Sequence, residues 1–216
     1  MVLQREKLEQ PHTLDEMRNL LDRFSADHIA FPDQLVHLRR GVFKDIIEEY
    51  APLYSLANNL EGFMWARLTK ESFPGPDAII QLNDQSQIAI QITTAGETQK
   101  TALQREVLSR GESIFRNQDA LRILPSKKIL MSGRALTTKK ANTEEMIEEV
   151  KTAIKRKISA YRNGTQCLLI LICQQSITME FDWKSQLRAA LLNITFAPYL
   201  EVYVTNTDTC TRCAGV

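Results

Sequence analysis

The sequence predicts an α/β fold with a mixed sheet flanked by helices, and three observations carry that prediction. Two short runs rich in β-branched residues, 76–82 and 87–93, flank a polar turn, which is typical of a β-hairpin. The segment 142–161 repeats its apolar residues at helical spacing. The run 167–173 is apolar throughout, as in a strand buried on both faces. Helices and strands therefore alternate along the chain, which favours a mixed sheet.

Length and composition limit the classes of protein that remain. The chain has 216 residues, of which 44% are hydrophobic and 25% charged, as in one globular domain with a real core. The net charge of +1 provides no overall field toward nucleic acid or membrane, so any basic surface must be local. No apolar run reaches membrane-spanning length and the first ten residues are too polar for a signal peptide. We expect a cytoplasmic protein without a membrane partner.

Three helices are expected before the hairpin. Thr13 and Glu16 have the spacing of a capping box, which predicts a helix that begins there. A second helix is expected over 34–50 and a third over 53–70, both from apolar residues at helical spacing. We expect the first two in a helical extension, which either packs on the core or forms a homodimer contact.

The expected division of the chain is a helical extension over 1–52, an α/β core over 53–205 and a flexible tail over 206–216. A lone Cys-x-x-Cys pair, Cys210 and Cys213, lies in that tail. A zinc site needs a second such pair, which the sequence lacks, so a loose tail is favoured. The last five residues resemble the end of a reading frame that runs into a mobile gene-cassette site, which would suggest a bacterial mobile-element protein.

The hairpin contains the candidate site. Side chains alternate between the faces of a strand, so Asp77, Gln91 and Thr93 converge at one end of the sheet if their rows face the same way. A carboxylate and an amide oxygen placed there could hold a hard cation such as Mg²⁺. The alternative is that Asp77 serves only the turn after a proline, and that Gln91 and Thr93 lie on a solvated face.

A Pro-Asp pair ending at Asp77, a hairpin, and then Gln-Ile-Thr over 91–93 resemble the motif of the PD-(D/E)XK nuclease superfamily. Asp77 matches the Asp of that motif. Gln91 falls where its second acid stands, and Thr93 where its Lys stands. The family often adds a Glu from the helix before the hairpin, and Glu61 is the candidate here.

The resemblance implies a restriction-endonuclease-like fold, DNA as substrate or partner, and Mg²⁺ bound by Asp77 and Gln91. The amide of Gln91 carries no charge and Thr93 carries no cation, so metal binding and charge stabilisation should both be weaker. Lys100 is the nearest substitute for the missing cation, and Glu97 for the missing acid. Two functions stay open: a magnesium-dependent endonuclease with weakened or lost activity, or a catalytically inactive relative that binds nucleic acid or protein.

One element that the family usually has is missing from the expected order. It is a strand between the first helix of the core and the Pro-Asp strand, and the segment 71–75 is too short for it.

Basic residues crowd the chain between 127 and 162. Phosphate contacts supply most non-specific affinity for nucleic acid, so such a cluster predicts a DNA-binding surface. Lys139 and Lys140, expected in a Thr-rich loop, are the favoured contacts. The alternative is a helix whose charges match its dipole and face solvent.

Overall fold

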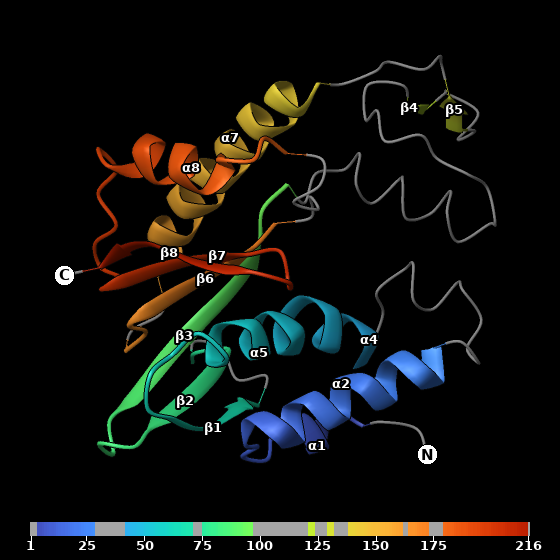
Figure 1. Ribbon diagram of the computed structural model, residues 1–216, viewed down its shortest axis with the longest axis vertical. Helices are drawn as coiled ribbons and strands as arrows, with labels where there is room; N and C mark the ends of the chain where they lie inside the picture. Colours follow the sequence, from blue (N-terminus) through green and yellow to red (C-terminus); the bar gives the residue numbers. More distant parts are fainter. Residues whose placement is uncertain are drawn as a thin grey trace.

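A six-stranded mixed sheet with helices on both faces forms the centre of the molecule (Figure 1). The predicted α/β class with a mixed, helix-flanked sheet is thereby confirmed. The computed structural model describes residues 4–28, 42–70, 75–96, 121–123, 129–131, 138–161, 164–172 and 179–215.

The strands of the main sheet follow the spatial order β1-β2-β3-β6-β7-β8. Their bounds are β1 Phe63–Leu68, β2 Ala78–Leu82, β3 Gln87–Thr94, β6 Cys167–Leu171, β7 Glu201–Thr205 and β8 Cys210–Gly215. β3, β6 and β7 run parallel to one another, and the outer strands pair antiparallel. Every residue of β6 is buried, as predicted for the run 167–173. A separate antiparallel pair joins β4 (Leu121–Ile123) to β5 (Ile129–Met131).

Helices cover the two faces of the sheet in two layers (Figure 1). One layer contains α1 (Arg5–Leu8), α2 (Leu14–His28), α4 (Val42–Lys44), the π-helix η1 (Asp45–Tyr50) and α5 (Ala51–Ala57). The other contains α7 (Lys139–Ser159) and α8 (Trp183–Leu191). Alternate residues of β6 enter the two resulting cores: Leu169 packs with the first layer and Leu168 with the second. The sheet is therefore buried on both sides, as its parallel centre requires.

The N-terminal residues share the first core with the sheet. Leu8 and Met17 are fully buried in the same cluster as Ile80 and Ile90. His12 also pairs with Ala66 of β1 through two backbone hydrogen bonds of 2.9 Å. The capping box is present, because the Thr13 N–H donates to Oε2 of Glu16 at 2.8 Å. The N-terminal segment thus closes one edge of the sheet.

The helix predicted over 53–70 is wrong in its second half. α5 ends at Ala57, a turn follows in which Gly62 adopts φ +71°, and β1 begins at Phe63. The apolar spacing of this segment fits both a helix and a strand, and sheet pairing decides the outcome, because β1 pairs with β2 from Phe63 to Leu68 with one irregularity between Phe63 and Trp65. β1 is also a strand between the first helix of the core and the Pro-Asp hairpin, the element that seemed to be missing.

Two further boundaries differ from the prediction. The tail expected over 206–216 contains β8, which pairs with β7 from Cys210 to Gly215. The helix expected to begin at 142 begins at Lys139, because Oγ1 of Thr138 accepts a hydrogen bond from the Ala141 N–H and caps it. Lys139 and Lys140 therefore lie in the first turn of a helix and not in a loop.

Candidate functional site

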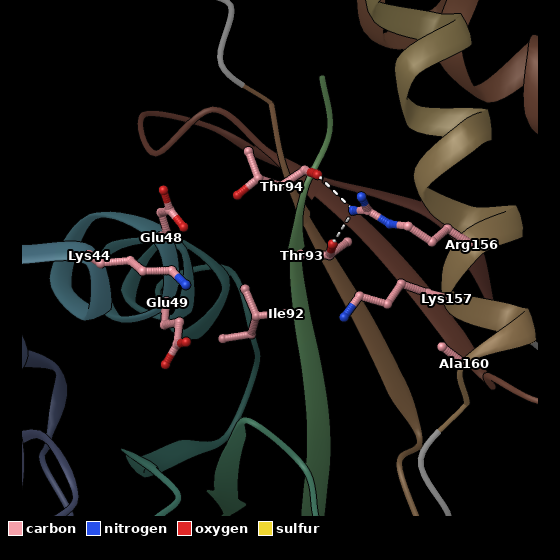
Figure 2. Close-up of a pocket in the computed structure, with 9 residues that line it drawn as sticks. All are labelled: Lys44, Glu48, Glu49, Ile92, Thr93, Thr94, Arg156, Lys157 and Ala160. Carbon is pink, nitrogen blue, oxygen red and sulfur yellow. Dashed lines mark hydrogen bonds between the residues drawn. The ribbon is translucent and has the colours of Figure 1, made fainter. Parts of the chain in front are cut away.

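The candidate site lies where β2 and β3 separate. The ladder between them runs from Gln81 opposite Gln87 to Ala78 opposite Ile90. Beyond Ile90, β3 continues to Thr94 and pairs with β6. A cavity of about 340 Å³ lies beside this last part of β3 (Figure 2). The separation of two paired strands thus creates an opening at the sheet.

The two helical layers supply opposite walls of this cavity. Figure 2 shows Lys44, Glu48 and Glu49 on one side of β3, and on the other side Arg156 and Lys157 of α7 with Ala160, which follows that helix. Ile92, Thr93 and Thr94 of β3 lie between the walls. The carboxylates of the cavity are all on the η1 wall, and two of its three cations are on the α7 wall. The charge of the site is therefore divided between its two sides.

The local sequence of η1 explains why acids face this cavity. Ile46 and Tyr50 are buried in the first core, so the turn must present its remaining side chains beside them. Asp45 and Glu49 both lie near Arg5 of α1: Nη1 of Arg5 is 2.7 Å from Asp45 Oδ1, and Nη2 is 3.6 Å from Glu49 Oε2. A π-helical turn is rare and is found often at functional sites.

Two acids lie near Ile92 of β3: Glu49 lines the cavity with it, and Asp77 accepts its N–H. Burial raises the pKa of Glu49 to about 7, Arg5 opposes that increase, and the negative charges of Asp45 and then Asp77 add to it. Asp77 precedes β2, and its Oδ2 accepts the Ile92 N–H at 2.7 Å. This hydrogen bond holds the Asp77 carboxylate against β3 where the strands separate.

Arg156 is bound to the end of β3. Its Nη2 donates to Oγ1 of Thr93 at 2.9 Å and to the backbone oxygen of Thr94 at 3.2 Å. The sequence sets Thr93 against the Lys of the nuclease motif, and in the structure the guanidinium of Arg156 lies beside that side chain.

Gln91, the other half of the predicted magnesium pair, has a different environment. Its side chain is only 1% exposed, and its Oε1 accepts a hydrogen bond from the hydroxyl of Tyr199. The backbone oxygen of Lys157 lies 3.2 Å from the same hydroxyl, as a second acceptor for its single proton. Neither Gln91 nor Asp77 is among the residues that line the cavity, but Asp77 is hydrogen-bonded to Ile92, which does line it. The amide oxygen of Gln91 is therefore hydrogen-bonded in the protein interior, beneath α7.

The remaining predicted residues lie apart from the cavity or outside the described residues. Glu61 is exposed in the turn between α5 and β1, and not on a helix. Lys139 and Lys140 are exposed at the first turn of α7, about 25 Å along the helix from Arg156 at the usual rise per residue. Lys100 and Glu97 lie outside the described residues.

Sequence reasoning missed Glu49 and Arg156. Glu49 adjoins the apolar stripe of Ile46 and Tyr50 and has the composition of an ordinary helix flank. Arg156 lies in a run of three cations at the C-terminal end of a helix, which the dipole alone explains. The available signal was only that their helices precede and follow the hairpin in the chain.

The donor set decides which metal ion these residues could hold. Within the described ranges, no group of three or more His, Cys, Asp or Glu side chains is arranged to hold a metal ion. Mg²⁺, however, commonly keeps several waters and uses only one or two carboxylates. Asp77 and Glu49 supply carboxylate oxygens, which suit that requirement by donor type, whereas Gln91 supplies an amide oxygen that is already hydrogen-bonded to Tyr199.

Comparisons with protein-family models, curated proteins and solved structures found no match. In the part of the chain that the structure describes, no helix has both the length and the apolar character needed to cross a membrane.

Proposed function

We propose that this chain is a restriction-endonuclease-like protein of the PD-(D/E)XK type that cleaves DNA phosphodiesters with Mg²⁺. The observation that carries the proposal is the hydrogen bond that holds the Asp77 carboxylate on the Ile92 N–H, where β2 and β3 separate and where Ile92 and Glu49 line the same cavity. Glu49 takes the role first expected for Glu61, since it comes from a helix before the hairpin and lines the cavity. The presence of β1 in the chain order also supports this fold.

Asp77 and Glu49 would hold the ion. When bound, Mg²⁺ would offset phosphate charge and lower the pKa of a water. Asp77 is kept in place by the Ile92 N–H, so its carboxylate is oriented before any ligand arrives. Glu49 must lose its proton to bind a cation, and its pKa of about 7 means that this loss occurs near neutral pH.

Cleavage of supercoiled plasmid in MgCl₂ or MnCl₂ tests the proposal. We expect wild type to nick the plasmid, and we expect Asp77→Asn and Glu49→Gln each to lower the rate at least ~100-fold. Glu61→Gln is the matched control, because it removes the same charge from an exposed turn, and it should cleave as wild type does. Equal rates in all four proteins, or no cleavage by any of them, would contradict the proposal.

A catalytically inactive nuclease-fold protein that binds nucleic acid or protein is the second candidate. The observation that favours it is the engagement of Gln91 by Tyr199, which leaves the position of the motif's second acid without a charge or a cavity-facing oxygen. DNA binding that survives Asp77→Asn, with no cleavage by wild type, would favour this function. The homodimer, the cytoplasmic location, the mobile-element origin and the DNA contacts of Lys139 and Lys140 stay predictions.

A further inference from the structure

We propose that the α7 wall of the cavity is a phosphate subsite in which Arg156, held by Thr93 and Thr94, is the principal contact and Lys157 the second. The inference rests on the proposed function, since it names the group of the DNA that the same cavity receives. It depends on a different observation, however, namely the hydrogen bonds of Arg156 and not the acids of η1.

The anchoring of Arg156 prepares its guanidinium for a ligand. Both of its hydrogen bonds to the described residues come from Nη2. A guanidinium carries five N–H donors in one plane, and three of them belong to Nε and Nη1. Each of these N–H groups can donate to one oxygen of a phosphate. Since the side chain is already fixed to β3, less conformational entropy is lost when these donors are used.

Helix-dipole compensation does not account for this arrangement. A cation that only balances the C-terminal end of α7 would stay near the last carbonyls of its own helix. Arg156 instead reaches across to β3 and donates to two residues there. Lys155, its neighbour in sequence, is exposed and does not line the cavity. One cation of the run is therefore directed into the site while the next is not.

The other charges of the cavity favour phosphate as the ligand. In Figure 2, Lys157 extends from α7 toward the same part of β3 as Arg156. The opposite wall carries Glu48 and Glu49, which would repel a simple anion. A phosphodiester that shares a cation with that wall meets opposite charge on both sides. The volume of about 340 Å³ is at the small end of the range for ligand sites, as suits a single backbone phosphate.

The subsite is tested by binding without cleavage. The probe is a fluorescent DNA duplex of about 20 base pairs, measured by anisotropy at low salt in EDTA and again in CaCl₂. We expect Arg156→Gln to weaken binding about fivefold or more, and to lower the slope of log K against log salt by about one. Arg156→Lys keeps the charge and should restore most of the slope. Lys155→Gln removes the same charge one residue away and should bind within about twofold of wild type.

The outcomes separate the subsite from the nuclease function. If wild type cleaves plasmid but Arg156→Gln binds as tightly as Lys155→Gln, the subsite is overturned and the nuclease function stands. If Arg156→Gln weakens binding and flattens the salt slope while wild type never cleaves, the subsite stands and the nuclease function falls. If wild type does not bind the duplex in either buffer, both fall. A loosened contact between α7 and β3 would lower the unfolding temperature of Arg156→Gln without changing the slope, and that result also overturns the subsite.

Discussion

The hydroxyl of Tyr199 donates a hydrogen bond to Oε1 of Gln91, a residue 108 positions earlier in the chain. This contact joins β3 to the segment that precedes β7, beneath α7. Both side chains are almost fully buried, with exposed fractions of 4% for Tyr199 and 1% for Gln91. The contact therefore fixes the strand next to the cavity from the side opposite η1.

Removal of the Tyr199 hydroxyl should destabilise the fold. In Tyr199→Phe the buried oxygen of Gln91 loses its donor, and we expect the free energy of unfolding to fall by about 1–3 kcal/mol. Urea denaturation measures the change. Tyr54→Phe is the control, because the Tyr54 hydroxyl meets Arg18 Nε at 3.0 Å in an exposed position, and its effect should stay within about 0.5 kcal/mol. If the free energy of unfolding fell equally in both variants, the buried hydrogen bond would contribute no more to stability than the exposed one.

Glu149 should make stability depend on pH. Burial, and then the charge of Glu145, raise the pKa of Glu149 from 4.5 to about 7. The folded state therefore holds this proton more tightly than the unfolded state, so stability should fall as pH rises from about 4.5 to about 7 and then level off. The loss is at most about 3 kcal/mol. Glu149→Gln cannot ionise, so it should gain stability relative to wild type between pH 4 and pH 8.

The comparison with Glu144→Gln isolates the effect of burial. Glu144 lies exposed on the same helix, and its replacement should leave the pH profile of the unfolding temperature unchanged. A parallel pH profile in wild type and Glu149→Gln would show that Glu149 ionises as freely in the folded protein as in the unfolded chain.

Strand β8 should be required for stability, in contrast to the loose tail that composition predicts. It pairs with β7, and Thr211 within it is only 3% exposed. Deletion of residues 206–216 removes that ladder and uncovers β7, and we expect a loss of more than about 3 kcal/mol. The unfolding temperature should fall by at least about 6 °C. Deletion of residue 216 alone is the control, and equal unfolding temperatures for both deletions would support a tail.

The Cys-x-x-Cys pair should bind no zinc and react slowly. Cys210 packs against the first core and Cys213 against the second, so the two thiols lie on opposite faces of the sheet. Burial raises the pKa of each thiol to about 12, which keeps the reactive thiolate scarce at pH 8. Labelling with a disulfide reagent should be slow in the native protein and fast in denaturant. Fast native labelling, or zinc retained after dialysis, would contradict this arrangement.

Local sequence patterns predicted those helices and strands whose apolar residues fit only one type of secondary structure. The hairpin of β2 and β3, the buried strand β6 and the helix after Thr13 all follow from turn residues, apolar runs and caps. β1 could not be predicted in the same way, because Phe63, Met64 and Leu68 suit a helix as well as a strand, and only the partner strand decides. β8 lacks an apolar run and is stabilised by its pairing with β7. The local sequence pattern therefore could not predict it.

The candidate site was predictable only in part, for a related reason. Asp77 was found because a Pro-Asp pair before a strand is a local signal. Glu49 and Arg156 were not, since each is an ordinary residue of its own helix and becomes distinctive only across the sheet. Gln91 was found by its position in the motif, but its hydrogen bond to Tyr199 depends on a segment more than a hundred residues away.

The π-helical turn of η1 fits six residues, Asp45–Tyr50, between two α-helical segments. Such a turn accommodates one residue more than an α-helix of the same rise. Loss of a single residue from it would restore a regular α-helix and leave the flanking helical segments in place. The wider turn that carries the extra residue would then be gone, so the number of residues in η1 shapes the acidic wall of the cavity as well as their identity does.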